Sequence, residues 1–592
     1  MTQQKFEPTK DGLYLKEPSG RRRICPAIEV TAIVRVDGST RRDVRLKFTD
    51  VDDTTRETTV QPSLLGKRNQ ILDHLVDYGY QPPADKESRD LIAEYLATAE
   101  PRRRIRAVHQ PGWVDVEHGG CFVLPDGPIP TTAADVEYRP LQKGAPIDAF
   151  GRSGDLRGWQ TEVAQPAADS SRLVFAICLA LAAPLLRFQR VDNVGVHLVG
   201  PSGCGKTTCL LVAKSVAGPA QRGQLPTWDF TDAGIEETAV SHNDSLLVLD
   251  ELARSTDTNQ ARRVQHVAYQ IANGRARMRS RAYTQHLDDP TLVWRLFFLS
   301  SGEQSLSEVA GDYNMTRRGG ELLRLIDLPA EAGRGIFDRV SQTRADPRQL
   351  AEALETAASD YHGTALPAFV DALCEDWGGI AKKVGKLVER FFEKAGVPSD
   401  GWERRFARPF AFAYAAGMLA VKRGVLPWQR ATVRRSVVAC YTAARNAVPD
   451  AEAVLEDGLA RLADKLDSDA ICDIRKRKPT PQAAQAADGY RRRERNGAER
   501  VLVKPKRFAS WFDNDLQHML VLDWLGKAGA LVRPSDRPIP TVQAQIAGIK
   551  RRRRYVALKP KRLIHALKET RKGRDEAGRA EALTACTPTN GA

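Results

Sequence analysis

The chain has few features that point to an oxidising compartment or to a metal scaffold. Its 9 cysteines are scattered through 592 residues. None of them forms a Cys-x-x-Cys pair, so the sequence shows neither a zinc framework nor a disulfide scaffold. The polar, charged N-terminus has no signal-peptide pattern. We therefore expect reduced thiols and a cytoplasmic location.

Long apolar runs are also scarce. The most apolar stretch, residues 173–186, is too short to span a bilayer and contains Pro184. It predicts a buried helix with the proline near its C-terminal end, and we expect no membrane partner.

Acidic residues are in deficit, because 89 Lys and Arg face 74 Asp and Glu, which gives a net charge of +15. Such a balance favours a polyanionic partner, and nucleic acid is the first candidate. A hydrophobic content of 42% allows ordinary globular cores.

The most informative stretch is residues 200–208, which fits the phosphate-loop pattern GxxxxGK[ST] between an apolar strand and an apolar helix. Glycines allow the backbone amides to approach phosphate oxygens, the lysine bridges the phosphates, and the Thr207 hydroxyl is a magnesium ligand. The predicted cofactors are ATP and Mg²⁺. The predicted nucleotide-binding residues are Gly200, Pro201, Ser202, Gly203, Cys204, Gly205, Lys206, Thr207 and Thr208.

A hydrophobic strand at residues 245–249 ends in Asp250 and Glu251, which is the Walker B form. At the carboxyl edge of a parallel sheet these carboxylates would lie beside the phosphate loop. Asp250 is the second predicted magnesium ligand, and Glu251 is the predicted base that orients and deprotonates water. A water-activating carboxylate favours hydrolysis over small-molecule phosphoryl transfer.

Two further catalytic positions follow. The strand 293–299 ends in Ser300 and Ser301, and we predict that Ser301 contacts the phosphate or the water, with a simple strand cap as the alternative. The basic loop that contains Arg317 and Arg318 predicts an arginine finger that acts on a neighbouring subunit. Arg324 is another candidate for the finger, and plain surface charge is the alternative for the loop.

Four alternating arginines follow a predicted helix, and in a hairpin strand they would share one face. We predict that they contact a nucleic-acid backbone; a solvated basic edge strand is the alternative. These residues are Arg275, Arg277, Arg279 and Arg281.

Together with Gly112-Trp113 and residues 408–417, the motifs at 200–208, 244–252, 272–274 and 294–303 resemble the domain-of-unknown-function nine-two-seven family over residues 5–450. This family is found in mobile genetic elements and prophages, and its members resemble the MCM group of AAA+ replicative helicases. The resemblance implies a hexameric ring with nucleotide at subunit boundaries, arginines 275–281 in a central channel, and a primase or other replication protein as partner. It also implies a lid arginine at Arg405 or Arg408.

The expected fold is α/β, with a P-loop NTPase core of the AAA+/ASCE type built on a parallel sheet. We expect a β-rich α+β region at 1–160, the core at 161–335 and a helical lid at 336–450. A basic linker at 451–507, a winged helix at 508–570 and a disordered tail at 571–592 would follow. The wing is expected to bind DNA through Arg551, Arg552, Arg553 and Arg554.

The sequence therefore predicts an ATP-dependent DNA helicase or translocase. The alternative is an ATP-switched initiator or loader that assembles on DNA without unwinding it. Both use the same nucleotide site, and a strand-displacement assay separates them.

Overall fold

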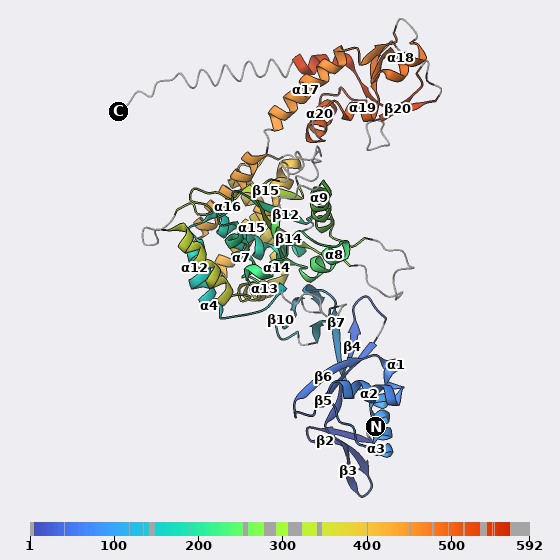
Figure 1. The fold of residues 1–592 in the computed structure, drawn as a ribbon, viewed down its shortest axis with the longest axis vertical. Coiled ribbons are helices and arrows are strands. Elements are labelled where there is room, and N and C mark those ends of the chain that lie inside the picture. Colours follow the sequence, from blue (N-terminus) through green and yellow to red (C-terminus); the bar gives the residue numbers. More distant parts are fainter. Residues whose placement is uncertain are drawn as a thin grey trace. The chain divides into compact units, whose positions relative to one another are not determined.

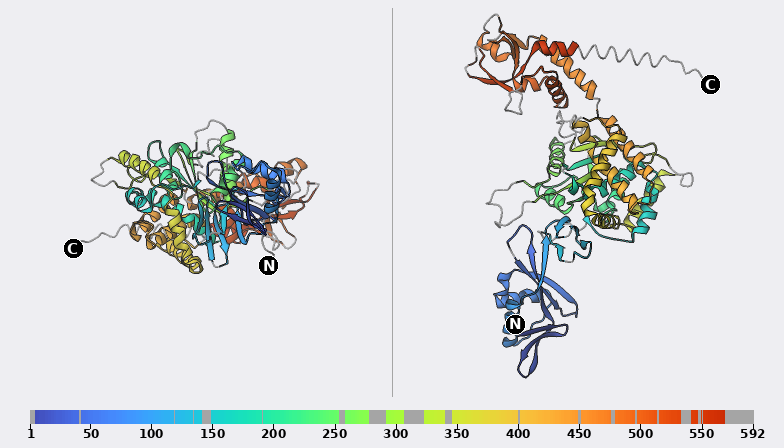
Figure 2. Two further views of the ribbon diagram at one scale, coloured as in Figure 1. Left: turned by 90° about the horizontal axis from the view of Figure 1, so that it is seen from below. Right: turned by 180° about the vertical axis from the view of Figure 1, so that it is seen from behind.

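The structure is a computed structural model that forms two compact units, one from residues 1–304 with 324–443 and one from residues 305–323 with 444–592. Figures 1 and 2 show their helices and strands. The residues it describes are 5–40, 42–117, 119–133, 135–140, 149–189, 191–252, 258–277, 292–305, 323–339, 346–399, 401–448, 451–475, 479–494, 497–512, 515–532, 541–546, 549 and 551–568. The predicted tail at 571–592 lies outside the described residues, as do Arg279, Arg281, Arg317 and Arg318.

The N-terminal region is built on a five-stranded sheet in the order β11-β7-β4-β5-β6 and a three-stranded antiparallel sheet β1-β2-β3. Alternating burial along β4 shows that one face of this sheet packs inward. The elements are β1 (Phe6–Thr9), β2 (Gly12–Glu17), β3 (Gly20–Cys25), β4 (Ile28–Val36), β5 (Arg42–Thr49), β6 (Thr55–Val60), α1 (Pro62–Leu65), α2 (Arg68–Asp77), α3 (Lys86–Thr98), β7 (Arg103–Val108) and β11 (Val136–Tyr138).

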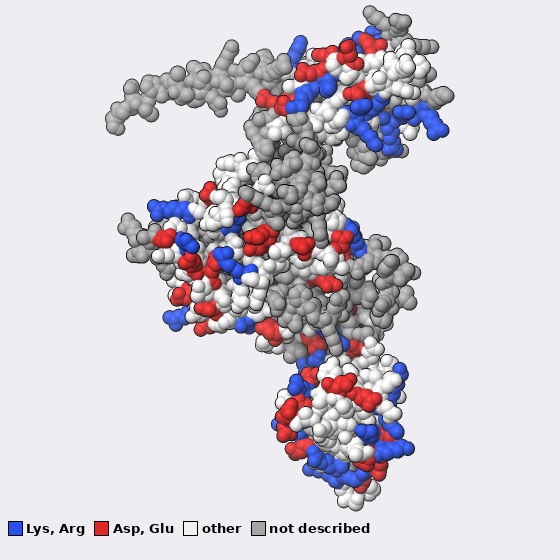
Figure 3. All heavy atoms as spheres, viewed as in Figure 1, with Lys and Arg blue, Asp and Glu red and all other residues white. Residues whose placement is uncertain are grey.

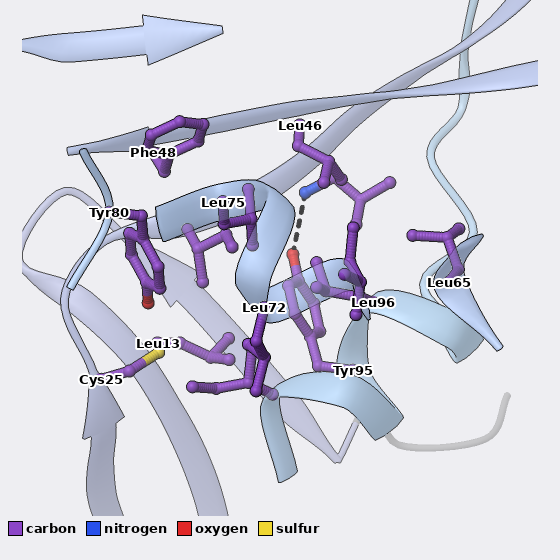
Figure 4. Close-up of a cluster of buried hydrophobic side chains, with 14 of the residues drawn as sticks. Leu13, Cys25, Leu46, Phe48, Leu65, Leu72, Leu75, Tyr80, Tyr95 and Leu96 are labelled. Atoms are coloured by element: carbon purple, nitrogen blue, oxygen red, sulfur yellow. Dashed lines mark hydrogen bonds between the residues drawn. The ribbon is translucent and has the colours of Figure 1, made fainter. Parts of the chain in front are cut away.

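An apolar cluster fills the space between the strands and the helices α2 and α3 (Figure 4), and a second, smaller cluster lies between β4 and β7. Tyr80 meets Phe48 edge to face with ring centroids 5.6 Å apart. The hydroxyl of Tyr95 accepts a hydrogen bond from the backbone amide of Val30 at 3.1 Å. Each buried tyrosine thus has an apolar contact for its ring or a polar partner for its hydroxyl.

A small sheet of β8 (Gly112–Val116), β9 (Gly119–Leu124) and β10 (Gly127–Ile129) joins this region to the centre of the first unit. The indole of Trp113 donates to the Pro184 carbonyl at 2.8 Å, and its backbone amide donates to Asp244 at 3.0 Å. A side chain at Gly112 would collide with Asp244, because its Cβ would lie 2.6 Å from a carboxylate oxygen. The Gly-Trp pair therefore connects the small sheet to Pro184 and Asp244 through contacts that leave no room for a side chain at position 112.

The centre of the first unit is a parallel sheet in the order β13-β14-β12-β15. Its strands are nearly continuous runs of apolar residues, as is typical of strands buried on both faces. Beyond β13, Thr227 pairs with Asp250 in an isolated parallel bridge. The strands are β12 (Val194–Val199), β13 (Ser245–Leu252), β14 (Leu296–Gly302) and β15 (Leu325–Pro329).

Helices cover this sheet (Figures 1 and 2). The predicted apolar helix is α6 (Ser171–Ala182), followed by a 3-10 turn that contains Pro184, and Phe175 stacks on Phe410 of α15 at 5.1 Å. The window Ser171–Phe188 is long and apolar enough to cross a membrane, but 89% of it is buried inside the structure, as in a core helix. The others are α7 (Lys206–Lys214), α8 (Asp232–Ser241), α9 (Thr258–Asn273), α12 (Pro347–Asp360), α13 (Ala365–Cys374), α14 (Trp377–Lys394), α15 (Gly401–Lys422) and α16 (Arg430–Ala447).

The second unit differs from the expected linker and small winged helix. Residues 451–507 contribute three strands to a five-stranded sheet in the order β16-β17-β18-β20-β19, with an apolar cluster on each face. The elements are α17 (Ala451–Asp467), β16 (Ile471–Asp473), α18 (Pro481–Ala486), β17 (Gly489–Arg493), β18 (Glu499–Val503), α19 (Pro505–Ala509), α20 (Asp515–Lys527), β19 (Thr541–Ala544) and β20 (Arg553–Leu558).

Candidate nucleotide site

The phosphate loop connects the carboxyl end of β12 to the N-terminus of α7. Gly203 and Gly205 have φ values of 79° and 100°, in the left-handed region that favours glycine. A Cβ on Gly205 would also lie 2.9 Å from Ile336. The two glycines therefore let the loop turn tightly into the first turn of α7, as the sequence pattern requires.

Lys206 lies at the first turn of α7 and closes the loop on itself. Its ammonium group donates to the carbonyls of Gly200 and Pro201, both at 2.8 Å. The free amides of the helix N-terminus give this end of α7 a partial positive charge. An ammonium group, helix-end amides and the Thr207 hydroxyl form a donor set that suits a polyphosphate with its metal ion.

The acidic pair lies at the carboxyl end of β13, one strand away from β12 across β14. Ser301 of β14 donates to Asp250 at 2.7 Å, and the Glu251 amide donates to the same carboxylate oxygen at 3.0 Å. Glu251 is exposed and has a φ of 40°, an uncommon conformation for a residue other than glycine. Backbone strain of this kind clusters at functional sites.

Ser300 and Ser301 point to different partners. The Ser300 hydroxyl is fully buried and hydrogen-bonds the His197 ring of β12 at 2.7 Å. The alternation of side chains along β14 turns Ser301 the other way, toward Asp250. Of the two serines, Ser301 is therefore the one that lies beside the acidic pair.

These elements surround one cavity of about 940 Å³. Residues on its wall come from the phosphate loop, from the ends of β13 and β14, from the segment after β15 and from α12. Asp250 is not among the lining residues, but its carboxylate accepts a hydrogen bond from Ser301, which is. The lining residues are Ser202, Gly203, Cys204, Gly205, Lys206, Thr207, Thr208, Arg222, Glu251, Ser301, Gly302, Glu303, Arg334, Gly335, Phe337, Asp346, Pro347, Arg348, Ala351, Glu352 and Glu355.

Glu355 connects α12 to α7. Its carboxylate accepts from the Thr208 hydroxyl at 2.6 Å and from two nitrogens of Arg222 at 2.7 and 2.8 Å. Partial burial acts to raise the pKa of Glu355, but the hydrogen bonds from Arg222 and Thr208 outweigh it and lower the pKa below its ordinary value. The carboxylate is therefore held ionised as a link between the two helices.

The arginines around the cavity are not those that the sequence singled out. Arg222, Arg334 and Arg348 line the cavity. Arg405 and Arg408, the predicted lid arginines, lie on α15 and are absent from the described wall of this cavity. Their role stays a prediction, as does that of Arg317 and Arg318.

The predicted nucleic-acid hairpin begins where α9 ends. Arg275 pairs with Val293 in an antiparallel bridge, so the described stem has the expected hairpin geometry. The side chain of Arg275 is exposed, whereas Arg277 donates to Asp232 at 2.9 Å. The positive charge of Arg277 is thus partly neutralised by the Asp232 carboxylate.

In the C-terminal unit, the four arginines predicted to bind DNA, residues 551–554, are all exposed. Arg553 and Arg554 begin β20 opposite Ala544 and Gln543 of β19, and Arg551 and Arg552 precede them. Figure 3 shows basic side chains gathered over this part of the second unit. β19 and β20 thus form an antiparallel hairpin with arginines at one end, although its first strand is not the predicted strand at 528–533.

Sequence reasoning missed Arg222, Arg334, Arg348 and Glu355. Each is a charged residue in an otherwise ordinary stretch, and Glu355 lies 147 positions from the Thr208 that it contacts. The one local signal was Asp346 before Pro347, which marks a helix start: the Asp346 side chain accepts from the Arg348 amide and caps α12. That signal places Arg348 on the first turn of a helix, but not beside a cavity.

Residues 4–285 match the model of a protein family described as Domain of unknown function (DUF927). This match confirms the resemblance indicated by the motifs. The match ends before residues 294–303 and 408–417, so it is shorter than the expected range of 5–450.

A solved structure described as "SCCmec type IV Cch - active helicase" is similar to this chain with a TM-score of 0.61 and 15% sequence identity, covering 94% of this chain and 97% of that one. At such low identity the similarity shows a shared fold. No curated protein matches the chain.

Proposed function

We propose that the protein is an ATP-dependent helicase or translocase that acts on DNA. The observation that carries the proposal is the gathering of Lys206, Glu251 and Ser301 around one cavity, with Asp250 bonded to Ser301. The similarity to a structure described as an active helicase supports the same assignment.

The order of strands supports a P-loop NTPase core of the AAA+/ASCE type. One strand, β14, separates the phosphate-loop strand β12 from the acidic strand β13. On the other side of β13, Thr227 pairs with Asp250 in an isolated parallel bridge. An inserted strand of this kind is typical of NTPases that use a carboxylate to activate water. It also supplies Ser301 between the two motifs.

The donor set fits ATP with Mg²⁺. Lys206 and the amides of residues 202–208 would bind the phosphates, and Thr207 and Asp250 would hold the magnesium ion, which supplies charge neutralisation. Glu251 would orient the attacking water and accept its proton. Ser301 holds Asp250 in place and offers a hydroxyl toward the cavity.

Other parts of the proposal come from the predicted resemblance. A hexameric ring would place Arg317 or Arg318 at a neighbour's nucleotide, and the hairpin at Arg275 in a central channel. The exposed arginines 551–554 would hold the DNA backbone from a winged-helix-like C-terminal unit. A primase or another replication protein is the proposed partner.

Nucleic-acid-stimulated ATP hydrolysis tests this function. Wild-type protein is expected to hydrolyse ATP faster with single-stranded DNA, and Lys206→Ala and Glu251→Gln are expected to lose that turnover. Glu393→Gln changes an exposed carboxylate on α14 and serves as the matched control. Full turnover by both site variants would eliminate the proposal.

Strand displacement on forked DNA then separates unwinding from loading. Displacement that needs ATP and is lost in Lys206→Ala supports a helicase. Stimulated turnover without displacement supports an initiator or loader.

A further inference from the structure

The amino edge of the parallel sheet, opposite the phosphate loop, has its own rigid framework. Asn193, just before β12, donates to the carbonyls of Ile271 and Trp294 at 3.1 and 3.3 Å. The Trp294 indole donates to the same Ile271 carbonyl at 2.8 Å. The end of α9 and the stem of the arginine hairpin are thereby fixed to the start of β12.

An aromatic ring is exposed beside this framework. Tyr269 of α9 keeps 48% of its surface open to solvent, and the Arg324 guanidinium lies 4.4 Å from the centre of its ring. Arg324 is itself anchored, because its carbonyl accepts from the Gly195 amide of β12 at 2.7 Å. The guanidinium supports the ring from one side and leaves ring surface uncovered.

The hairpin stem that follows α9, the helix that carries Tyr269, has an apolar and a positive side chain. Val293 is 47% exposed in the hairpin stem and faces Arg275 across the antiparallel bridge. Among the residues that the structure describes, no carboxylate pairs with Arg275 or Arg324, in contrast to Arg277, which pairs with Asp232. An open aromatic ring in contact with the Arg324 guanidinium, with a second guanidinium, Arg275, in the stem that follows the same helix, matches the chemistry of a single nucleic-acid strand.

We propose that Tyr269 and Arg324 form a stacking subsite for an unpaired base, with Arg275 at the adjoining phosphates. The subsite rests on the proposed function, because it defines the substrate at this edge as single-stranded. In a duplex the faces of the bases are covered by their neighbours, so a ring on the surface of a rigid sheet edge selects unpaired bases.

Fluorescence anisotropy with a labelled single-stranded oligonucleotide and its abasic counterpart tests the subsite in the full-length protein. Tyr269→Ala is expected to bind the ordinary strand about 5- to 100-fold more weakly, which is the usual range for losing one stacked base. The same variant should bind the abasic strand like wild type, because no base is present to stack.

Tyr269→Phe keeps the ring and should retain wild-type affinity. Tyr78→Ala is the matched control, since Tyr78 is an exposed tyrosine, 38% accessible, next to α2 of the N-terminal region. A fluorescent ATP analogue should bind wild type and Tyr269→Ala equally, which shows that the variant is folded.

Equal affinity of Tyr269→Ala and wild type for the ordinary strand would overturn the subsite. So would an equal loss on the ordinary and abasic strands. If wild type binds DNA and its ATPase is stimulated while Tyr269→Ala behaves the same, only the subsite fails. If wild type neither binds DNA nor responds to it, the proposed function fails as well.

Discussion

The two edges of the parallel sheet differ in how they use their charged residues. At the carboxyl edge, Glu355 bonds Arg222 and Thr208, and Asp250 bonds Ser301, so charges are held in place around a cavity. At the amino edge, Asn193 and Trp294 make amide and indole hydrogen bonds and Asp244 pairs with Arg295, but Arg275 and Arg324 have no carboxylate partner among the residues that the structure describes.

This difference separates the two proposed tasks. A small, highly charged ligand needs groups fixed at defined positions inside a concave site. A long polyanion needs accessible positive charge that is not already neutralised. Changes at one edge should therefore affect nucleotide chemistry, and changes at the other edge should affect DNA binding.

The largest effect is expected at Glu251. Glu251→Gln keeps the size of the side chain but removes the base, so kcat for ATP hydrolysis should fall by about 10²- to 10⁴-fold. Steady-state phosphate release measures it, with Glu393→Gln as control. Affinity for single-stranded DNA should be unchanged; a large loss of DNA affinity would show that the two edges are not separable.

A substitution of Asp244, the residue just before β13, tests stability without changing the cavity. Asp244 is fully buried and accepts from Arg295 at 2.9 Å and from the Trp113 amide at 3.0 Å. Asp244→Ala leaves these donors without a partner and should lower the free energy of unfolding by about 3 kcal/mol. Thermal unfolding checks this.

Asp73→Ala, at an exposed position of α2, is the control for that experiment. If the Asp244→Ala protein is as stable as this control, the Asp244 carboxylate does not stabilise the contact between Gly112-Trp113 and the start of β13.

A smaller effect is expected from Glu355→Gln. A neutral amide forms a weaker link to Arg222 and Thr208, so the first unit should lose about 1 kcal/mol of stability at neutral pH. Because the pKa of Glu355 is lowered in the folded state, its contribution is present above the ordinary glutamate pKa and is lost as the pH falls below it. In unfolding curves, the gap between wild type and variant should narrow as the pH falls below the ordinary glutamate pKa toward the lowered folded-state pKa. A gap that stays constant as the pH falls would contradict this role.

The smallest effect is expected from single arginines at the amino edge. Arg275→Gln should weaken DNA binding a few-fold and reduce the slope of log affinity against log salt by about 1. Arg103 pairs with Asp135 at 2.8 Å, so Arg103→Gln should leave that slope unchanged. Equal effects of the two variants would remove the distinction between paired and unpaired arginines.

The sequence was sufficient where neighbouring residues perform one task together. The phosphate loop and the Asp-Glu pair are local patterns, and the parallel strands that carry them are plain apolar runs. Their meeting at one edge follows from the topology of a parallel sheet. The helices α12 to α16 were predictable for the same reason, since each has an apolar face with helical spacing.

The sequence was insufficient where a segment rich in charged residues forms a partly buried strand. β17 reads Gly-Tyr-Arg-Arg-Arg, a composition that predicts a basic linker, yet Tyr490 is fully buried. The strand is tolerated because neighbouring acids compensate for the arginines, as in the pair of Arg492 with Glu494 at 2.7 Å. The link between Glu355 and Arg222 was missed for another reason: it joins residues 133 positions apart, whose proximity only the fold defines.

Direct titration of the protein with ATP and Mg²⁺ tests the central claim, that the cavity at the carboxyl edge is the nucleotide site. The account predicts one site per chain in wild type, retained in Glu251→Gln and lost in Lys206→Ala, whose circular dichroism spectrum should match wild type. Undiminished ATP binding by a folded Lys206→Ala protein would contradict it.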